Sequence, residues 1–169
     1  MRPAHAPTNR LIKGTRHVEK AVETLHAEGL KVELKMIDRQ PWDTMPEFLS
    51  GCDILIDQLM MGWYGLLAME GMAEAKAVVA HLRADFSEHL MGCPVVDATP
   101  QSLAEVLRAL VRDPERRAML GAAGKRYVEQ RHDLQVVGER LLREYRRVLD
   151  TGKPEAIPLR VPVAGTRPA

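Results

Sequence analysis

The sequence predicts an α/β fold in which helices cover both faces of a mostly parallel sheet. Short β-type runs alternate with amphipathic helical runs through most of the 169 residues. A parallel sheet needs such alternation, because each crossover between neighbouring strands is long enough to hold a helix. The chain has the length of one domain, and 46% apolar residues are enough for a core. We therefore expect a Rossmann-like, doubly wound domain over residues 1–150.

The first half of the chain contains most of the predicted strands. "GTRHVEKAVETLHAEG" (14–29) places apolar residues on one helical stripe and ends at a glycine, which is typical of a helix stop. "KVELKMI" (31–37) alternates like a strand, and "PEFLSGC" (46–52) indicates a short helix. "DILIDQL" (53–59) predicts a central strand, followed by a helix over about 65–75. "AVVAHL" (77–82) and "PVVDA" (94–98) predict two more strands, with a short segment near 85–91 between them.

Three helices are predicted to close the ordered chain. Thr99-Pro100 and Asp113-Pro114 each place a capping side chain before a first-turn proline, which signals a helix start. The last helix is expected over 133–149, with Val137, Leu141, Tyr145 and Val148 on its inner stripe. Residues 151–169 hold four of the eleven prolines and no helical period, which indicates a strap or a disordered tail.

The beginning of the chain is unusual for a complete doubly wound protein. Only "MRPAHA" precedes the loop "PTNRLIKG", whereas such a domain normally opens with four to six apolar residues. We therefore expect the chain to begin inside or just before its first strand, as a fragment of a longer protein or a short reading frame does.

Charge and hydropathy exclude several classes of partner. Lys and Arg total 24 against 23 Asp and Glu, and this balance disfavours a dedicated nucleic-acid binder. No secretion signal opens the chain. The most apolar window, residues 54–69, is interrupted by Asp57 and Gln58 and is too short for a membrane span of about 20 residues. We expect a cytoplasmic protein with no membrane span and no nucleic-acid partner.

Two loops are expected at the carboxyl ends of strands, where open α/β sheets bind their ligands. The first, "HAPTNRLIKGT" (5–15), places Arg10 and Lys13 just before a helix N-terminus. Two cations beside exposed backbone N–H groups form a natural phosphate site. The alternative is a solvated loop whose charges have no ligand.

The second loop, "MMGWYGLLAMEGMA" (60–73), precedes the next predicted helix. Gly62 and Gly65 permit a tight turn, and the N–H groups of Gly65, Leu66 and Leu67 can point at an anion where that helix begins. Glu70 follows in the helix, and a carboxylate can accept two hydrogen bonds from the vicinal hydroxyls of a ribose. The alternative for Glu70 is an ordinary solvent-facing helix residue.

Three segments together resemble a known family. They are "HAPTNRLIKGT", "GCDILIDQLMMGWYGLLAMEGMAEAKAVVAHL" and "SLAEVLRALVRDPERRAMLGAAGKRYVEQRHD". Their order and spacing are similar to the C-terminal, donor-binding domain of GT-B glycosyltransferases, in the large retaining class (group 1, family 4-like) that uses nucleotide-diphosphate sugars. The resemblance covers about residues 5–149, and it implies the C-terminal half of a GT-B architecture.

The resemblance also implies roles for individual residues. Lys13 contacts the diphosphate of the donor, with Arg10 as its companion, and the turn Gly65-Leu66-Leu67 supplies amides to the same group. Glu70 matches the ribose-binding glutamate of the family element that reads "EGMAEAKAVV" here. The neighbouring residues Gly62, Trp63 and Tyr64 are expected to contact the donor sugar. The resemblance identifies no catalytic residue.

This chain departs from the family pattern at several positions. Many relatives carry a second glutamate eight positions before the ribose one, where this chain has Gly62; Asp57 or Gln58 is the nearby replacement. The usual arginine five positions before the lysine falls on Thr8, so Arg10 is a shifted substitute. Ala75 and Ala77 replace a common glycine and proline. The identity of the sugar depends on these positions more than nucleotide binding does.

The sequence therefore predicts the donor half of a hexosyltransferase-like enzyme that binds a nucleotide-diphosphate sugar such as a UDP-sugar. We expect no metal and no cofactor, since the histidines and cysteines lack metal-ligand spacing. An N-terminal acceptor domain is expected to be missing, which would leave the chain inactive alone and prone to self-association. The alternative is a non-catalytic or regulatory remnant that keeps the nucleotide pocket; a sugar-nucleotide epimerase has no positive signal.

Overall fold

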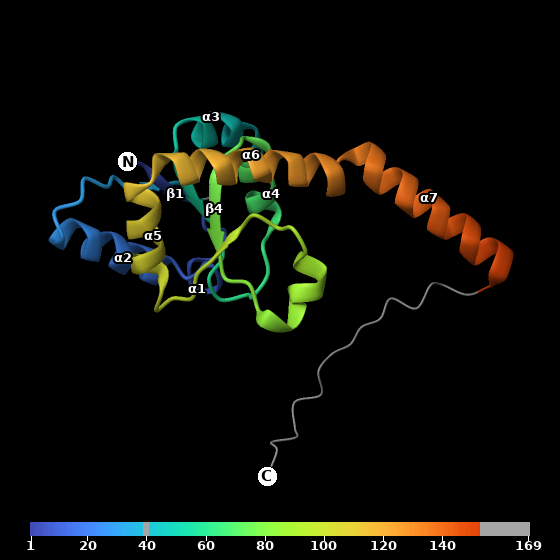
Figure 1. Ribbon diagram of the computed structural model, residues 1–169, viewed down its shortest axis with the longest axis horizontal. Coiled ribbons are helices and arrows are strands. Elements are labelled where there is room, and N and C mark those ends of the chain that lie inside the picture. The colour runs from blue at the N-terminus through green and yellow to red at the C-terminus, as the bar shows by residue number, and fades with distance from the viewer. Residues whose placement is uncertain (39–40, 153–169) are drawn as a thin grey trace, which may run out of the picture.

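The computed structural model describes residues 1–38 and 41–152. Within them, five strands form one parallel sheet (Figure 1). The strand order is β2-β1-β3-β4-β5. Every adjacent pair runs parallel, as the alternation of strands and helices predicts. The strands are β1 (Pro3–His5), β2 (Lys35–Met36), β3 (Ile54–Ile56), β4 (Ala77–Ala80) and β5 (Val96–Asp97).

The strand order creates a crevice between β1 and β3. From β1 the chain moves outward to β2, and it then returns to place β3 on the other side of β1. Pro3 pairs with Ile54 across these two central strands, and Ile54 pairs with Ala77 of β4. In open parallel sheets such a reversal opens a ligand crevice at the carboxyl ends of the two strands.

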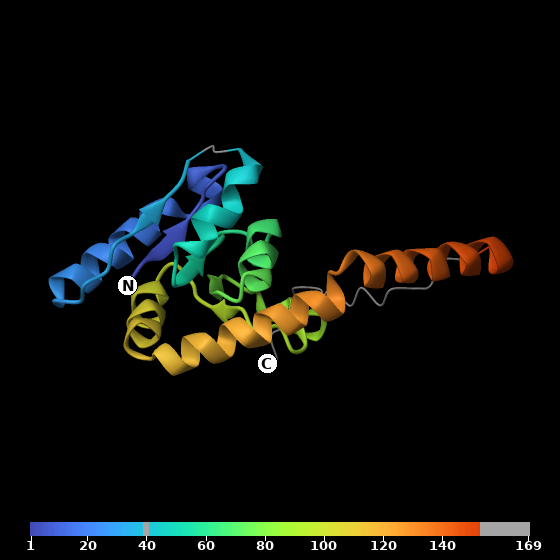
Figure 2. The ribbon, with the colours of Figure 1, turned by 90° about the horizontal axis from the view of Figure 1, so that it is seen from above.

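Helices cover both faces of the sheet, as predicted. On one face α2 and α5 pack against each other, and on the other α6 packs across α4 and β4 (Figures 1 and 2). Two 3₁₀ segments, η1 (Trp42–Thr44) and η2 (Ala84–Leu90), lie in the connections. The helices are α1 (Arg10–Lys13), α2 (Thr15–Ala27), α3 (Met45–Ser50), α4 (Leu66–Ala73), α5 (Leu103–Arg112), α6 (Pro114–Arg131) and α7 (Leu134–Thr151).

The two core layers follow from the alternation of side chains along the central strands. In β3, Ile54 and Ile56 face the layer under α2 and α5, whereas Leu55 faces the layer under α3, α4 and α6. β4 repeats this division, with Val79 in the first layer and Val78 in the second. The predicted α2 stripe is buried in the first layer: Val18, Ala21, Val22 and Leu25.

Strand lengths and one helix start differ from the sequence prediction. The runs 31–37 and 53–59 contain strands of only two and three residues. The amides of Glu33, Ile37, Asp53 and Asp57 still donate to carbonyls of neighbouring strand segments, so the pairing fades gradually at the ends of these runs. Asp113 caps α6 as predicted, accepting a hydrogen bond from the Arg116 amide. The helix start predicted at Thr99-Pro100 was placed too early, because α5 begins at Leu103. The Thr99 hydroxyl accepts a hydrogen bond from the Ser102 amide in the turn that precedes the helix.

The largest correction concerns α7. Its bounds agree with the prediction, but none of its residues is buried, and Leu141 and Tyr145 of the predicted inner stripe are 49% and 62% exposed. The helix turns away from α6 and extends out from the body of the domain (Figures 1 and 2). An amphipathic pattern predicts that a face is apolar, but it does not predict which surface covers that face.

Two further predictions concern the ends of the chain and membranes. Apart from its first two residues, the predicted tail 151–169 lies outside the residues that the structure describes. Within residues 1–38 and 41–152, no helix combines the length and hydropathy that a membrane crossing requires.

Candidate functional site

The segment after β1 brings Lys13 to the crevice. Asn9 caps the single turn of α1, its side-chain oxygen accepting from the amides of Leu11 at 3.0 Å and Ile12 at 3.1 Å. Gly14 ends that turn at φ +74°, a conformation that glycine adopts without strain. This tight turn holds Lys13 at the edge of the sheet, beside the end of β3.

Lys13 is held there by the segment that follows β3. Its ammonium lies 2.5 Å from Asp57 Oδ1 and 3.1 Å from Gln58 Oε1. The side chain of Asp57 is fully buried and that of Lys13 is 12% exposed. An ammonium has three N–H donors, so these two bonds leave one donor for a ligand.

Asp57 also fixes the beginning of α4. Its second oxygen, Oδ2, accepts from the Gly65 amide at 2.8 Å, so one buried carboxylate joins Lys13 to the N-terminal end of the helix. The amide of Gly65, predicted to contact a diphosphate, is therefore engaged by Asp57. The amides of Leu66 and Leu67 follow in the first turn of α4, where N–H groups have no acceptor within the helix.

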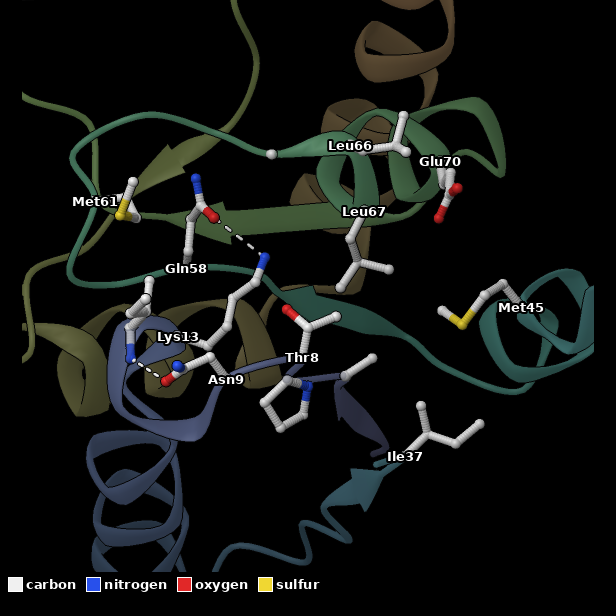
Figure 3. A pocket seen from close by; sticks show the side chains of 14 residues that line it. Thr8, Asn9, Lys13, Ile37, Met45, Gln58, Met61, Leu66, Leu67 and Glu70 are labelled. Carbon is white, nitrogen blue, oxygen red and sulfur yellow. Dashed lines mark hydrogen bonds between the residues drawn. The ribbon is translucent and has the colours of Figure 1, made fainter. Parts of the chain in front are cut away.

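These groups line a cavity of about 460 Å³ (Figure 3). Lys13 and Glu70, which the sequence assigns to two parts of one ligand, face it from opposite sides. Ile37 and Met45 contribute an apolar wall beyond Glu70. The lining residues are Ala6, Pro7, Thr8, Asn9, Ile12, Lys13, Ile37, Met45, Gln58, Met61, Gly65, Leu66, Leu67 and Glu70.

The environment of Glu70 alters its acidity. Partial burial raises the pKa of the Glu70 carboxyl above the ordinary glutamate value, and the nearby negative charge of Asp57 raises it further. A carboxylate in such a position benefits from hydroxyl donors, because hydrogen bonds to the charged form favour it.

Arg10, predicted to accompany Lys13, lies elsewhere. Its guanidinium is 2.7 Å from Glu19 and 3.5 Å from Asp38, and Arg10 does not line the cavity. Of the residues that line the cavity, Lys13 is the one with a cationic side chain.

The aromatic pair that follows Gly62 also lies outside the cavity lining. Tyr64 is buried in the second core layer, where its hydroxyl lies 3.2 Å from the Tyr127 hydroxyl and 3.0 Å from His132 Nε2. Trp63 stacks on Tyr64 and meets Phe86 edge-on. These two aromatic residues therefore anchor the tight loop to α6 and η2, and burial raises the pKa of the Tyr64 hydroxyl.

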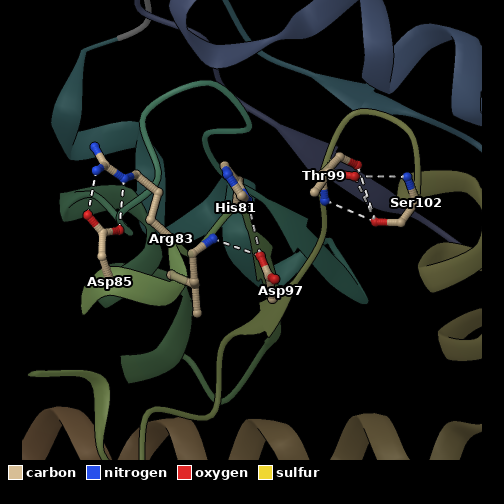
Figure 4. Close-up of polar contacts among 7 residues, drawn as sticks. His81, Arg83, Asp85, Asp97, Thr99 and Ser102 are labelled. Carbon is tan, nitrogen blue, oxygen red and sulfur yellow. Dashed lines mark hydrogen bonds and ion pairs between the residues drawn. The ribbon is translucent and has the colours of Figure 1, made fainter. Parts of the chain in front are cut away.

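The space at Gly62, where many relatives have a glutamate, is filled by another side chain. A Cβ at this position would lie 2.4 Å from both Cγ and Cδ of Arg83, and Gly62 has φ +77°. Arg83 is itself paired with Asp85 at 2.5 Å (Figure 4). Glycine suits this position both by its backbone angle and by the lack of room beside it.

Two histidines, one at the last position of β1 and one directly after β4, belong to the framework. His5 is fully buried in β1, with Nδ1 2.9 Å from the Ile56 carbonyl and Nε2 3.0 Å from the Thr15 hydroxyl. Burial lowers the pKa of His5 and so favours its neutral form. His81 lies 3.2 Å from Asp97, which also accepts from the Leu82 amide and joins the ends of β4 and β5 (Figure 4). No group of three or more potential metal ligands occurs in the part of the chain that the structure describes.

The parallel sheet with helices on both faces defines the class of protein: an α/β domain like the C-terminal domain of GT-B glycosyltransferases. The family model described as "Glycosyl transferases group 1" matches residues 2–127, so the chain belongs to that family. This confirms the resemblance predicted from the sequence.

Two curated relatives are similar in sequence. An uncharacterized glycosyltransferase of Methanocaldococcus jannaschii is 25% identical over 112 residues, 64% of this chain and 32% of that protein. A GDP-mannose-dependent monoacylated alpha-(1-6)-phosphatidylinositol monomannoside mannosyltransferase of Corynebacterium glutamicum is 28% identical over 141 residues, 78% of this chain and 37% of that protein. The chain thus spans about a third of the length of the curated relatives it matches.

Two solved structures share the fold. The C-terminal domain of a glycosyl transferase group 1 family protein from Francisella tularensis has a TM-score of 0.55 and 17% identity, over 79% of this chain and 86% of that one. TarM of S. aureus, a G117R mutant solved with fondaparinux, alpha-GlcNAc-glycerol and UDP, has a TM-score of 0.61 and 15% identity. The match covers 84% of this chain and 34% of TarM.

Sequence reasoning did not identify several groups of this site. Ile37 and Met45 lie after β2 and at the start of α3, in segments whose patterns indicate only secondary structure. The sequence suggested Asp57 only as a replacement for the carboxylate that is missing at Gly62. In the structure, Asp57 accepts hydrogen bonds from both the Lys13 ammonium and the Gly65 amide. One available signal was its place directly after the buried strand β3, where a charged side chain needs a partner.

Proposed function

We propose that the cavity between β1 and α4 binds a nucleotide-diphosphate sugar, and that the chain forms the donor half of a glycosyltransferase. The observation that carries the proposal is that Lys13 and Glu70, from segments 57 residues apart, face one cavity. The remaining N–H of the Lys13 ammonium and the Leu66 and Leu67 amides suit a diphosphate. Glu70 suits the two ribose hydroxyls, and the apolar wall at Ile37 and Met45 suits a base.

In this proposal Lys13 acts on the leaving group. The bond from the anomeric carbon to the diphosphate breaks with negative charge building up on the phosphate oxygens. A preorganised ammonium and two helix amides would stabilise that charge without a metal ion. Retention of the anomeric configuration is the expectation from the family. Asp57 would contribute indirectly by holding Lys13 and the start of α4 in place.

We further propose that transfer requires an acceptor-binding part beyond these 169 residues. The chain spans about a third of its curated relatives, and the cavity is lined from one sheet edge. UDP is the first nucleotide to test and GDP the second, since the named relative from Corynebacterium uses GDP-mannose. Hexosyl specificity and a cytoplasmic location stay predictions.

Calorimetric titration of the 169-residue chain with UDP and GDP tests the donor site. Lys13→Ala and Glu70→Ala should each weaken binding of the preferred nucleotide by about 1–3 kcal/mol, the usual worth of a hydrogen bond to a charged group. Lys20→Ala, on the exposed side of α2, is the matched control and should leave the affinity unchanged. Wild-type affinity in both site variants would contradict the assignment.

A second candidate, a non-catalytic remnant, is favoured by two observations. Asp57 lies directly beside the single cationic group of the cavity lining, and Gly62 stands where relatives carry a sugar-binding carboxylate. Both features weaken donor binding relative to the family pattern. If the unmodified chain gives no titration signal with either nucleotide, the remnant is the better description.

A further inference from the structure

The lining of the cavity offers few hydrogen-bond donors to a diphosphate. Lys13 has one N–H left after its bonds to two side-chain acceptors, and the Gly65 amide is bound by Asp57. The amides of Leu66 and Leu67 remain in the first turn of α4. A diphosphate carries several charged oxygens, each a strong acceptor. If the cavity binds a donor as proposed above, part of the diphosphate therefore needs a partner beyond the lining residues.

The order of the lining residues indicates on which side that partner is needed. Glu70 faces the cavity from one side, and the Lys13 ammonium lies between Glu70 and Met61 (Figure 3). In the proposed function the ribose lies at Glu70 and the first phosphate follows it toward Lys13. The second, distal phosphate and the sugar then extend toward Met61.

Arg83 reaches this side of the cavity from the next strand. Strand β4 ends at Ala80, and three residues later the Arg83 amide donates to the Gly62 carbonyl at 2.9 Å. Gly62 directly follows Met61 of the cavity lining. The Arg83 side chain crosses over Gly62, where a Cβ would lie 2.4 Å from its Cγ and Cδ. A glycine at φ +77° leaves this path open.

The Arg83 guanidinium is held in one orientation and keeps donors for a ligand. Its Nε and Nη2 donate to the two oxygens of Asp85, at 3.0 and 2.5 Å (Figure 4). The guanidinium carbon lies 5.1 Å from the centroid of the Phe86 ring. A guanidinium has five N–H groups, so three remain, including both on Nη1. The side chain of Arg83 is 55% exposed, so a ligand can approach these donors.

We propose that Arg83 is a donor-binding residue whose guanidinium binds the distal phosphate of a nucleoside diphosphate beside Gly62. This inference rests on the proposed donor site and adds a second cation to it. The sequence assigned that part to Arg10, which pairs with Glu19 and Asp38 instead. Because Arg83 lies on the Met61 side, it contacts the distal phosphate and not the first one. The preference of the chain for nucleoside diphosphates over monophosphates therefore depends on Arg83.

Calorimetric titration of the full chain with UDP and UMP tests the role of Arg83, with GDP and GMP in their place if guanine is preferred. Arg83→Gln should lower the affinity for UDP about tenfold or more, as loss of a charged hydrogen-bonding contact does, and the affinity for UMP by less than about twofold. General damage to the loop would weaken both nucleotides alike. Arg108→Gln, which breaks a similar pair with Glu28 away from the cavity lining, is the control and should change neither affinity.

Gly62→Ala tests the path of the Arg83 side chain. The added Cβ meets the Arg83 methylene groups and displaces the guanidinium, so the variant should lower the affinity for UDP. In an Arg83→Ala chain the same substitution should have little further effect on that affinity. Backbone strain at position 62 is common to both backgrounds, so the difference between them reports on Arg83.

Unchanged affinity for UDP in Arg83→Gln, or an equal loss for UDP and UMP, would overturn the inference. If Lys13→Ala and Glu70→Ala weaken nucleotide binding while Arg83→Gln does not, the proposed donor site stands and only the role of Arg83 is wrong. A wild-type chain that binds neither UDP nor GDP would overturn both.

Discussion

Ala75 illustrates how one residue departs from its family and strains the backbone. Among the described residues it is the one non-glycine with positive φ, at +52°, directly after α4 and its C-cap Glu74. The left-handed conformation costs an L-residue about 1–2 kcal/mol, and relatives commonly have glycine here. The backbone cannot easily relax, because the Ala75 carbonyl packs on Gly121 of α6, where an added Cβ would lie 2.0 Å from that oxygen.

We therefore expect Ala75→Gly to stabilise the protein. Relief of the left-handed strain outweighs the greater flexibility of glycine in the unfolded chain, for a net gain of about 0.5–1 kcal/mol in the free energy of unfolding. Urea denaturation measures it. Ala73→Gly, two residues earlier at the last residue of α4, should instead lose up to about 0.5 kcal/mol, less than in a helix interior. A loss at both positions would show that Ala75 is unstrained.

The residues of the site show what the sequence can and cannot predict. Lys13 and Glu70 were predicted to face one ligand because each follows a strand whose carboxyl end lies at the same sheet edge. Arg10 satisfied the same rule but pairs with Glu19 of α2 and with Asp38, partners that no local pattern reveals. Tyr64 was predicted to contact the donor sugar, but its side chain is buried and its hydroxyl lies near Tyr127 and His132, partners that no local pattern reveals.

At the scale of elements, one buried carboxylate connects three of them. Asp57 at the end of β3 binds Lys13 of α1 and the amide that begins α4. Loss of either charge leaves the other partly unsatisfied in a buried setting, which is more costly than loss of an exposed pair. The relative position of β1 and α4, and therefore the shape of the cavity, depends on this contact.

A double-mutant cycle measures that connection. Lys13→Met and Asp57→Asn should each lower the free energy of unfolding by about 1–3 kcal/mol, and the double variant should lose clearly less than their sum because neither charge is then stranded. Arg10→Met with Glu19→Gln, an exposed pair 2.7 Å apart, is the matched control, with a coupling below about 1 kcal/mol. Equal coupling free energies in the two cycles would mean that the buried Lys13–Asp57 contact is worth no more than the exposed Arg10–Glu19 pair.

The elements were predictable to different degrees, for physical reasons. The prediction for α2 was correct in its bounds and in its buried face. The reason is that its apolar stripe is narrow and the opposite side of the helix carries many charged residues. The bounds of α7 were equally clear, yet its stripe faces solvent, since amphipathicity does not identify the covering surface. The strands were predicted too long because an apolar run continues past the last regular strand pairing, where single amides such as those of Ile37 and Asp57 still donate to the neighbouring strand.

The whole molecule divides into a packed body and a projecting helix. The body holds both core layers and the cavity lined by Lys13 and Glu70, whereas α7 contributes no buried residue to it. His132, just before α7, belongs to the body, because its ring lies 3.0 Å from the Tyr64 hydroxyl that anchors the aromatic loop. Stability and the proposed nucleotide binding should therefore be properties of residues up to about 133.

Shortened chains test this division. A chain of residues 1–133 should keep the free energy of unfolding within about 0.5 kcal/mol, since it loses no core contact, and it should titrate nucleotide like the full chain. A chain of residues 1–131 also loses His132 and its contact with Tyr64, and should be less stable by about 1 kcal/mol. If the 1–133 chain is destabilised by more than 2 kcal/mol, on the order of a lost core side chain, then α7 packs on the body in solution.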